Sequence, residues 1–241
     1  MKIAAVQMGS GPDKSANIQR AVAFIQQAIS QGAEFIALPE VFNYRGPTGK
    51  PSDLKIIKER VPGESLQPLM NLAKKHKVFI LAGSIFEEIK NSEKVYNTSV
   101  SIDRQGRAAA VYRKQNLFDA DLGDKQVKES SCFSAGKELA TAQVEDFKLG
   151  LTICFDLRFP EVFRAYAKKG VNVFTVPSAF TRFTGQSHWE DLVILFLIFG
   201  LMVTDFLYDA ARFAIESDPL ILSEKRWAVI GSAVGSLMSR I

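Results

Sequence analysis

One cysteine lies at a position suited to nucleophilic chemistry. Cys154 belongs to the stretch Leu149–Glu161, LGLTICFDLRFPE, in which apolar residues recur at every second position. This period of two predicts a buried strand that ends near Asp156, and Pro160 suits the start of a helix that continues over Glu161–Lys169. Cys154 is therefore expected at a strand end, where α/β sheets place ligands and chemistry. The alternative is a small core residue, the more common role of a free cysteine.

Two charged residues also follow predicted strands. The near-continuous apolar run Glu34–Pro39 predicts a strand covered on both faces, and Glu40 follows it directly. Lys114 ends a strand predicted over Arg107–Arg113. Taken alone, Glu40 is equally well explained as a helix cap or surface charge, and Lys114 as a surface lysine.

The surroundings of these residues resemble the motifs of the nitrilase, or carbon–nitrogen hydrolase, superfamily. CFDLRFPE resembles its cysteine motif, AEFIALPEVF its glutamate motif and VYRKQNLFDAD its lysine motif, in the family's order. KESSCFSAG resembles the loop that carries an additional glutamate, here Glu129, and PSAFTRFTGQSHWE resembles the segment after the next strand. Together these stretches cover residues 1–190, and the resemblance stops after Glu190.

The resemblance implies a catalytic set of Cys154, Glu40, Lys114 and Glu129. Metal-free amide hydrolysis needs a nucleophile, a base that later acts as an acid, and a positive group near the developing oxyanion. Cys154 would form a thioester, and Glu40 would move the protons. Lys114 would stabilise the oxyanion together with a backbone N–H near Phe155, and Glu129 would orient Lys114 or the substrate.

Arg158 has two interpretations. It can hold a carboxylate of the substrate, or it can pair with Glu161 or another neighbouring acid. The motifs look closest to the branch of ω-amidases and deaminated-glutathione amidases, which implies a small carboxylate-bearing amide, such as α-ketoglutaramate or deaminated glutathione, and release of ammonia. Nitrile hydrolysis is the less favoured substrate class.

Composition predicts an ordinary globular protein. The 241 residues are 47% hydrophobic and 23% charged, and the net charge of +4 is scattered, which argues against a nucleic-acid partner. The N-terminus shows no signal-peptide pattern, and the two cysteines and two histidines suit neither a disulfide framework nor a zinc site. We therefore expect a cytoplasmic enzyme with no cofactor, no metal and a small-molecule substrate.

The pattern of elements favours a single α/β domain over residues 1–241. Hairpins in the centre of the chain predict mixed sheets. The family resemblance implies a four-layer α-β-β-α sandwich. Besides those above, the predicted strands are residues 2–8, 78–87, 95–102, 138–147 paired with 149–155 around Lys148, and 171–176. One predicted helix is capped by Asp13 or Ser15 and stops at Gly32, and another spans residues 66–77. Residues 42–54 and 115–136 are predicted loops.

The C-terminal segment Asp191–Ile241 departs from the family. Leu192–Val203 contains no polar side chain, but it is short for a membrane span and predicts a buried element that covers the domain and is needed for solubility. The alternative is a segment that does not dock and drives self-association or membrane binding. Gly231 and Gly235 form a weak helix-packing pattern. A homodimer is expected unless this segment disrupts it. Two other hypotheses remain: a nitrilase-like protein impaired in catalysis, and a hydrolase that pairs Cys154 with His188.

Overall fold

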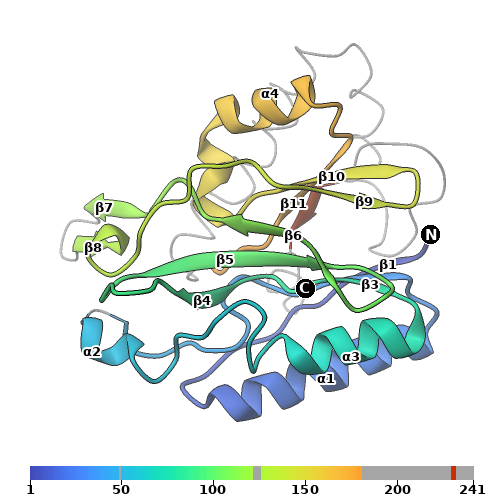
Figure 1. Ribbon diagram of the computed structural model, residues 1–241, viewed down its shortest axis with the longest axis horizontal. Helices are drawn as coiled ribbons and strands as arrows, with labels where there is room; N and C mark the ends of the chain where they lie inside the picture. The colour runs from blue at the N-terminus through green and yellow to red at the C-terminus, as the bar shows by residue number, and fades with distance from the viewer. Residues whose placement is uncertain (49, 122–125, 181–228, 232–241) are drawn as a thin grey trace, which may run out of the picture.

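The chain folds into four layers, with two β-sheets enclosed between helices. The computed structural model describes residues 1–48, 50–121, 126–180 and 229–231 (Figure 1). Helices α1 and α3 cover the outer face of the first sheet, and α4 covers that of the second (Figure 1). The predicted α-β-β-α order is therefore confirmed. The helices are α1 (Lys14–Ser30), α2 (Pro51–Leu54), α3 (Gln67–His76) and α4 (Pro160–Lys168), with 3₁₀ turns η1 (Glu129–Ser131) and η2 (Cys154–Arg158).

Both sheets are mixed, as predicted. In the first sheet, β1, β2 and β3 are parallel neighbours, whereas β3, β4 and β6 each run antiparallel to β5. The second sheet has the order β12-β11-β10-β9, with only the β9–β10 pair antiparallel among the described strands. The strands are β1 (Ile3–Ala5), β2 (Phe35–Ala37), β3 (Phe79–Leu81), β4 (Ile85–Glu88), β5 (Val95–Ile102), β6 (Ala108–Arg113), a separate hairpin of β7 (Asp119–Asp121) and β8 (Gln126–Lys128), β9 (Thr141–Val144), β10 (Phe147–Leu151), β11 (Val173–Val176) and β12 (Val229–Gly231).

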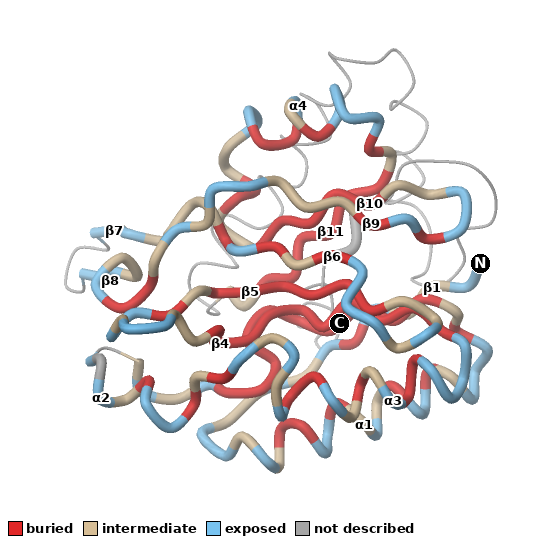
Figure 2. The backbone as a smooth tube through the Cα atoms, viewed as in Figure 1, coloured by how far each residue is buried: buried red, intermediate tan, exposed pale blue. Residues whose placement is uncertain are grey.

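The residues at the interfaces between the layers are buried (Figure 2), and apolar side chains form a core cluster at each interface. Ile25 of α1 packs with Ile36 on one face of β2, while Phe35 on the other face belongs to the core between the sheets. This alternation explains why the predicted strand before Glu40 is apolar at nearly every position. In the outer layer, the Tyr166 ring of α4 lies 6.1 Å from that of Phe174 in β11.

The strand that leads to Cys154 ends earlier than predicted. β10 stops at Leu151, and Cys154 begins the 3₁₀ turn η2 with a left-handed φ of 47°. The apolar alternation misled the prediction because Ile153 is buried although it lies outside the strand. The predicted turn at Lys148 is also wrong: Lys148 is inside β10, and the turn lies at Glu145, which adopts a φ of 51°.

Other predicted segments are subdivided. Residues 78–87 form two strands, β3 and β4, because Gly83 adopts a left-handed φ of 39° between them. The predicted loop over residues 42–54 contains α2, and the one over residues 115–136 contains β7, β8 and η1.

The C-terminal segment contributes one described strand. β12 pairs in parallel with β11, so Gly231 belongs to a strand and its interpretation within a helix-packing pattern is wrong. The remainder of Asp191–Ile241, including Leu192–Val203 and Gly235, lies outside the described residues, and the predicted role of this segment in solubility stays a prediction. No described helix has both the length and the apolar character that a membrane crossing requires.

Candidate active site

Glu40 follows β2 on a segment with an unusual backbone. The next residue, Val41, adopts a left-handed φ of 46°, which is rare for a β-branched side chain. Its N–H donates to the hydroxyl of Ser84 at 2.9 Å, which helps to hold this conformation. Gly83 approaches from the other chain segment: a Cβ at this position would lie 1.8 Å from the carbonyl oxygen of Pro39. The close contact between these two turns therefore fixes the entry into Glu40.

The buried carboxylate of Glu40 accepts hydrogen bonds from three chain segments. Oε1 accepts from Nδ2 of Asn97 at 3.0 Å and from Nζ of Lys114 at 3.3 Å. Oε2 accepts from the N–H of Ala179 at 2.9 Å. These donors come from β5, from the end of β6 and from the segment after β11, so the carboxylate has one fixed orientation.

Lys114 directly follows β6 and is only 2% exposed. Its backbone N–H donates to Asn97 at 2.9 Å, and its carbonyl accepts from Gly136 at 2.8 Å. Its Nζ lies between Glu40 and Glu129, at 3.0 and 3.1 Å from the two oxygens of the latter. Burial alone would lower the pKa of Lys114, but the charges of Glu40 and Glu129 outweigh it and raise the pKa well above its usual value. The side chain is therefore an ammonium at any physiological pH.

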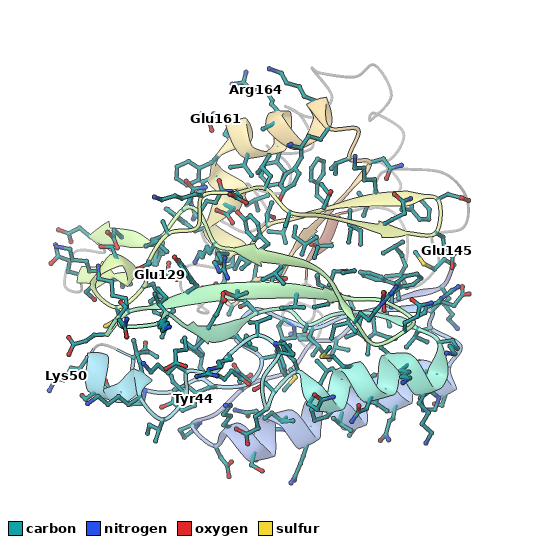
Figure 3. All side chains as sticks on the ribbon, in the orientation of Figure 1. Tyr44, Lys50, Glu129, Glu145, Glu161 and Arg164 are labelled. Carbon is teal, nitrogen blue, oxygen red and sulfur yellow. The ribbon has the colours of Figure 1, made fainter. Side chains whose placement is uncertain are left out.

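Glu129 lies on η1, beside the β7–β8 hairpin (Figure 3). Besides the ammonium of Lys114, its Oε2 accepts the backbone N–H of Phe118 at 2.5 Å. The segment over residues 115–136 thus folds back on itself to bring a second carboxylate to the lysine. This placement agrees with the position that the family resemblance implies for Glu129.

Cys154 lies at the start of η2, with its backbone N–H donating to Pro177 at 3.0 Å. Burial in the surrounding protein raises the pKa of the thiol, the charge and a hydrogen bond of Glu40 raise it further, and Lys114 and the N–H of Ala179 lower it. The net direction is upward, so the resting group is a thiol. A thiol in this setting needs a base to become a nucleophile, and Glu40 is adjacent.

Phe155 and Arg158 occupy the same turn. Among the described residues, the Phe155 N–H has no hydrogen-bond acceptor, which leaves it free for an oxyanion. The guanidinium of Arg158 lies 4.8 Å from the Phe155 ring and 5.8 Å from that of Phe180. Burial of the guanidinium lowers the pKa of Arg158 overall, and the smaller influence of Cys154 acts in the opposite direction. No ion pair joins Arg158 to Glu161 or to another acid in the described part of the chain.

Asp156 is a structural residue of the site that the sequence analysis did not identify. Its fully buried carboxylate accepts from the Ile153 N–H at 2.9 Å, from the Tyr112 hydroxyl at 2.8 Å, and from the N–H and side chain of Asn116 at 2.9 and 2.8 Å. It thus ties the turn of Cys154 to the segment after Lys114. A lone aspartate two residues past a cysteine gives no sequence signal for this role.

The structure thus brings Glu40, Lys114, Glu129 and Cys154 into one connected group. His188, the partner in the alternative Cys–His hypothesis, lies outside the described residues. No cluster of three or more potential metal-ligating side chains occurs in the part that the structure describes. The group therefore contains a thiol, a neighbouring base and a fixed cation, which suits acyl transfer through a cysteine.

Comparison with known proteins gives consistent results. The carbon–nitrogen hydrolase family model matches residues 2–193. Over 190 residues the chain is 38% identical to the ω-amidase NIT2 of Homo sapiens, covering 78% of this chain and 67% of that protein. It is 36% identical to nitrilase homolog 2 of Dictyostelium discoideum, of which it spans only 57%.

A solved structure is similar as well. The crystal structure of Nit3 from Saccharomyces cerevisiae, a member of branch 10 of the nitrilase superfamily, aligns with a TM-score of 0.71 at 34% identity. The alignment covers 82% of this chain and 71% of Nit3.

Proposed function

The chain belongs to the carbon–nitrogen hydrolase family, and we propose that it hydrolyses the C–N bond of a small amide through a thioester on Cys154. The observation that carries this proposal is the position of one buried ammonium, that of Lys114, between Glu40 and Glu129, with the thiol of Cys154 next to Glu40. The similarity to ω-amidases supports an amide as substrate.

Acylation starts with proton transfer from the thiol to Glu40 as the sulfur attacks the carbonyl carbon. The negative charge that forms on the carbonyl oxygen is stabilised by the ammonium of Lys114 and the N–H of Phe155, which has no acceptor among the described residues. Glu40 then gives its proton to the departing nitrogen, the C–N bond breaks and ammonia leaves. A thioester remains on Cys154.

Deacylation repeats these steps with water. Glu40 takes a proton from water as its oxygen attacks the thioester carbonyl, and Lys114 again faces the oxyanion. Collapse of this intermediate breaks the C–S bond, releases the carboxylic acid and returns the proton from Glu40 to the sulfur. Glu40 therefore acts as base and acid in both halves.

Arg158 supports the proposed class of substrate. A half-buried guanidinium that rests on aromatic rings, without a described acid as partner, is suited to a carboxylate of the substrate. We assign the chain a small amide that carries a carboxylate, such as α-ketoglutaramate or deaminated glutathione. We further propose a cytoplasmic homodimer, in keeping with the family resemblance; light scattering of the purified chain tests the dimer.

The test is ammonia release from these two amides, with succinamide and a simple nitrile for comparison. Cys154→Ala should lose at least about 10³-fold in kcat/KM, whereas Cys132→Ala, at a buried cysteine outside the site, should keep its activity. Mass spectrometry of wild type quenched during turnover should show the acyl adduct on Cys154. Equal rates for Cys154→Ala and wild type would refute the nucleophile, and a wild type inactive on every compound would favour the non-catalytic hypothesis.

A further inference from the structure

Asn97 contacts both Glu40 and Lys114 from the middle of the first sheet. Its side-chain N–H donates to Oε1 of Glu40 at 3.0 Å, and its backbone carbonyl accepts the N–H of Lys114 at 2.9 Å. The residue is 2% exposed and belongs to β5, which pairs with β3, β4 and β6. Asn97 is therefore a buried residue of the sheet that is hydrogen-bonded both to the carboxylate of Glu40 and to the backbone of Lys114.

The chemistry of the contact sets the orientation of the amide. If the side chain of Asn97 were turned over, its Oδ1 would face Oε1 of Glu40, and two acceptors would repel each other. With the N–H toward Glu40, Oδ1 is buried and has no hydrogen-bond partner among the described residues. An unpaired buried carbonyl lowers the stability of the folded protein. At Asn97 this cost accompanies the hydrogen bond that its side-chain N–H donates to the proposed catalytic base, Glu40.

The two oxygens of Glu40 have different surroundings. Oε1 accepts from Asn97 and Lys114, whereas Oε2 accepts from the N–H of Ala179, which also hydrogen-bonds to the thiol of Cys154. Because Oε1 already accepts two of these hydrogen bonds and Oε2 only one, Oε2 is the oxygen with capacity left to accept from the thiol. Rotation of the carboxylate would exchange these roles.

We propose that Asn97 is a positioning residue for amide hydrolysis, which fixes the Glu40 carboxylate through Oε1 so that Oε2 exchanges the proton with Cys154. The inference rests on the proposed function, because it assigns Asn97 a role in the same proton transfers. Within the described part of the chain, the charged and titratable groups close to Glu40 are Lys114 from the end of β6, Cys154 from η2 and, beyond the lysine, Glu129 from η1.

A second charged pair near β5 does not take part. Glu87 of β4 accepts from Arg113 at 2.6 Å and from the hydroxyl of Thr98 at 2.7 Å. Thr98 follows Asn97 along the strand, so its side chain lies on the opposite face of the sheet. The Glu87–Arg113 pair is therefore separated by the sheet from Glu40.

The experiment measures alkylation of Cys154 by iodoacetamide against pH, in a Cys132→Ala background so that one cysteine reacts. Asn97→Leu removes the donor at similar volume, and Asn97→Asp places a second carboxylate against Glu40. Ser99→Ala is the matched control, a buried residue two positions along β5. A carboxylate that loses an N–H donor binds a proton more readily. We therefore expect the acid limb of the profile of alkylation rate against pH to move to higher pH, by about one unit in Asn97→Leu and further in Asn97→Asp. It should stay in place in Ser99→Ala.

Amide turnover supplies the second measurement. Both Asn97 variants should lose about 10- to 100-fold in kcat, with KM within about 3-fold of the background. If Asn97→Leu does not fold, as judged by circular dichroism, the isosteric Asn97→Asp carries the test. Acid limbs that coincide with the background, or an equal shift in Ser99→Ala, would overturn the proposal. If the limbs shift but no amide is hydrolysed by the background protein, the proposed function fails and the positioning of Glu40 stands.

Discussion

The ammonium of Lys114 lies 3.0 Å from Oε2 and 3.1 Å from Oε1 of Glu129, so both oxygens of this carboxylate contact it. Glu40 contacts the same nitrogen through one oxygen only, at 3.3 Å. Glu129 is therefore the firmer anchor of the lysine. This division leaves Glu40 able to exchange a proton while Lys114 keeps its position.

Substitution of this anchor should affect catalysis more than folding. We expect Glu129→Gln to lower kcat by about 10²-fold, because Lys114 loses one of the two groups that hold it at the oxyanion. Glu129 also raises the pKa of Lys114, so its neutralisation lowers that pKa, although the charge of Glu40 remains beside the ammonium. Steady-state kcat at neutral pH measures the loss. Glu93→Gln, at an exposed acid, should match wild type; a kcat of Glu129→Gln equal to that of wild type would contradict the assignment.

Removal of the cation should destabilise the protein. Lys114→Met leaves the buried carboxylate of Glu40 and the partly buried carboxylate of Glu129 without their shared partner, which should cost about 3–5 kcal/mol of unfolding free energy. The double variant Lys114→Met/Glu129→Gln should regain part of this loss, because one of the two charges is gone. Urea unfolding of the two variants and wild type gives the comparison. A single variant as stable as wild type, or a double variant less stable than the single one, would show that the charges are not coupled in this way.

The family resemblance was sufficient to predict the four layers, and local sequence patterns marked several of the elements and the candidate site residues. Asp13, predicted to cap the first helix, accepts the N–H of Ala16 at 3.0 Å. The strand predicted over residues 95–102 is observed with the same limits. Glu40, Lys114 and Cys154 were identified by motifs, and the structure brings them together.

Features that depend on contacts between distant segments could not be predicted. Asn97 and Asp156 resemble ordinary strand and turn residues until their partners are known, since the residues that they contact lie 57 and 44 positions away at Glu40 and Tyr112. The left-handed backbone of Cys154 was also missed, because the apolar alternation continues through this residue and gives no sign that the strand has ended. The limits of β10 are set by tertiary hydrogen bonds rather than by side-chain periodicity.

Gly83 should be intolerant of any side chain. A Cβ there would lie 1.8 Å from the Pro39 carbonyl oxygen, and its φ of 39° is unfavourable for other residues. Gly83→Ala should therefore displace the segment before Glu40, with a loss of unfolding free energy above about 2 kcal/mol and of most activity. Gly9→Ala is the control, because no atom lies within 4 Å of the added Cβ. Thermal unfolding and ammonia release measure both variants, and equal behaviour of the two would contradict the predicted clash.

Asp156 should make stability depend on pH in a defined direction. Burial raises the pKa of this carboxyl above 3.8, although its hydrogen-bond donors act to lower it. The folded state then binds the proton more tightly than the unfolded state, so the contribution of Asp156 is fully present below about pH 3.8 and is lost as pH rises through the raised pKa.

We expect Asp156→Asn to be less stable than wild type by about 1–3 kcal/mol, because an amide NH2 group replaces one of the two oxygens that face the N–H and O–H donors of Ile153, Tyr112 and Asn116. The amide does not titrate, so the deficit of the variant should be largest in acid and should shrink as pH rises from about 4. Chemical unfolding of wild type and variant at several pH values gives this difference, in which the other titrating groups largely cancel. Asp146→Asn, at an exposed turn, should show neither a deficit nor a pH-dependent difference. A deficit for Asp156→Asn that grows with pH would mean that the buried carboxylate is stabilised by its donors more than it is destabilised by burial.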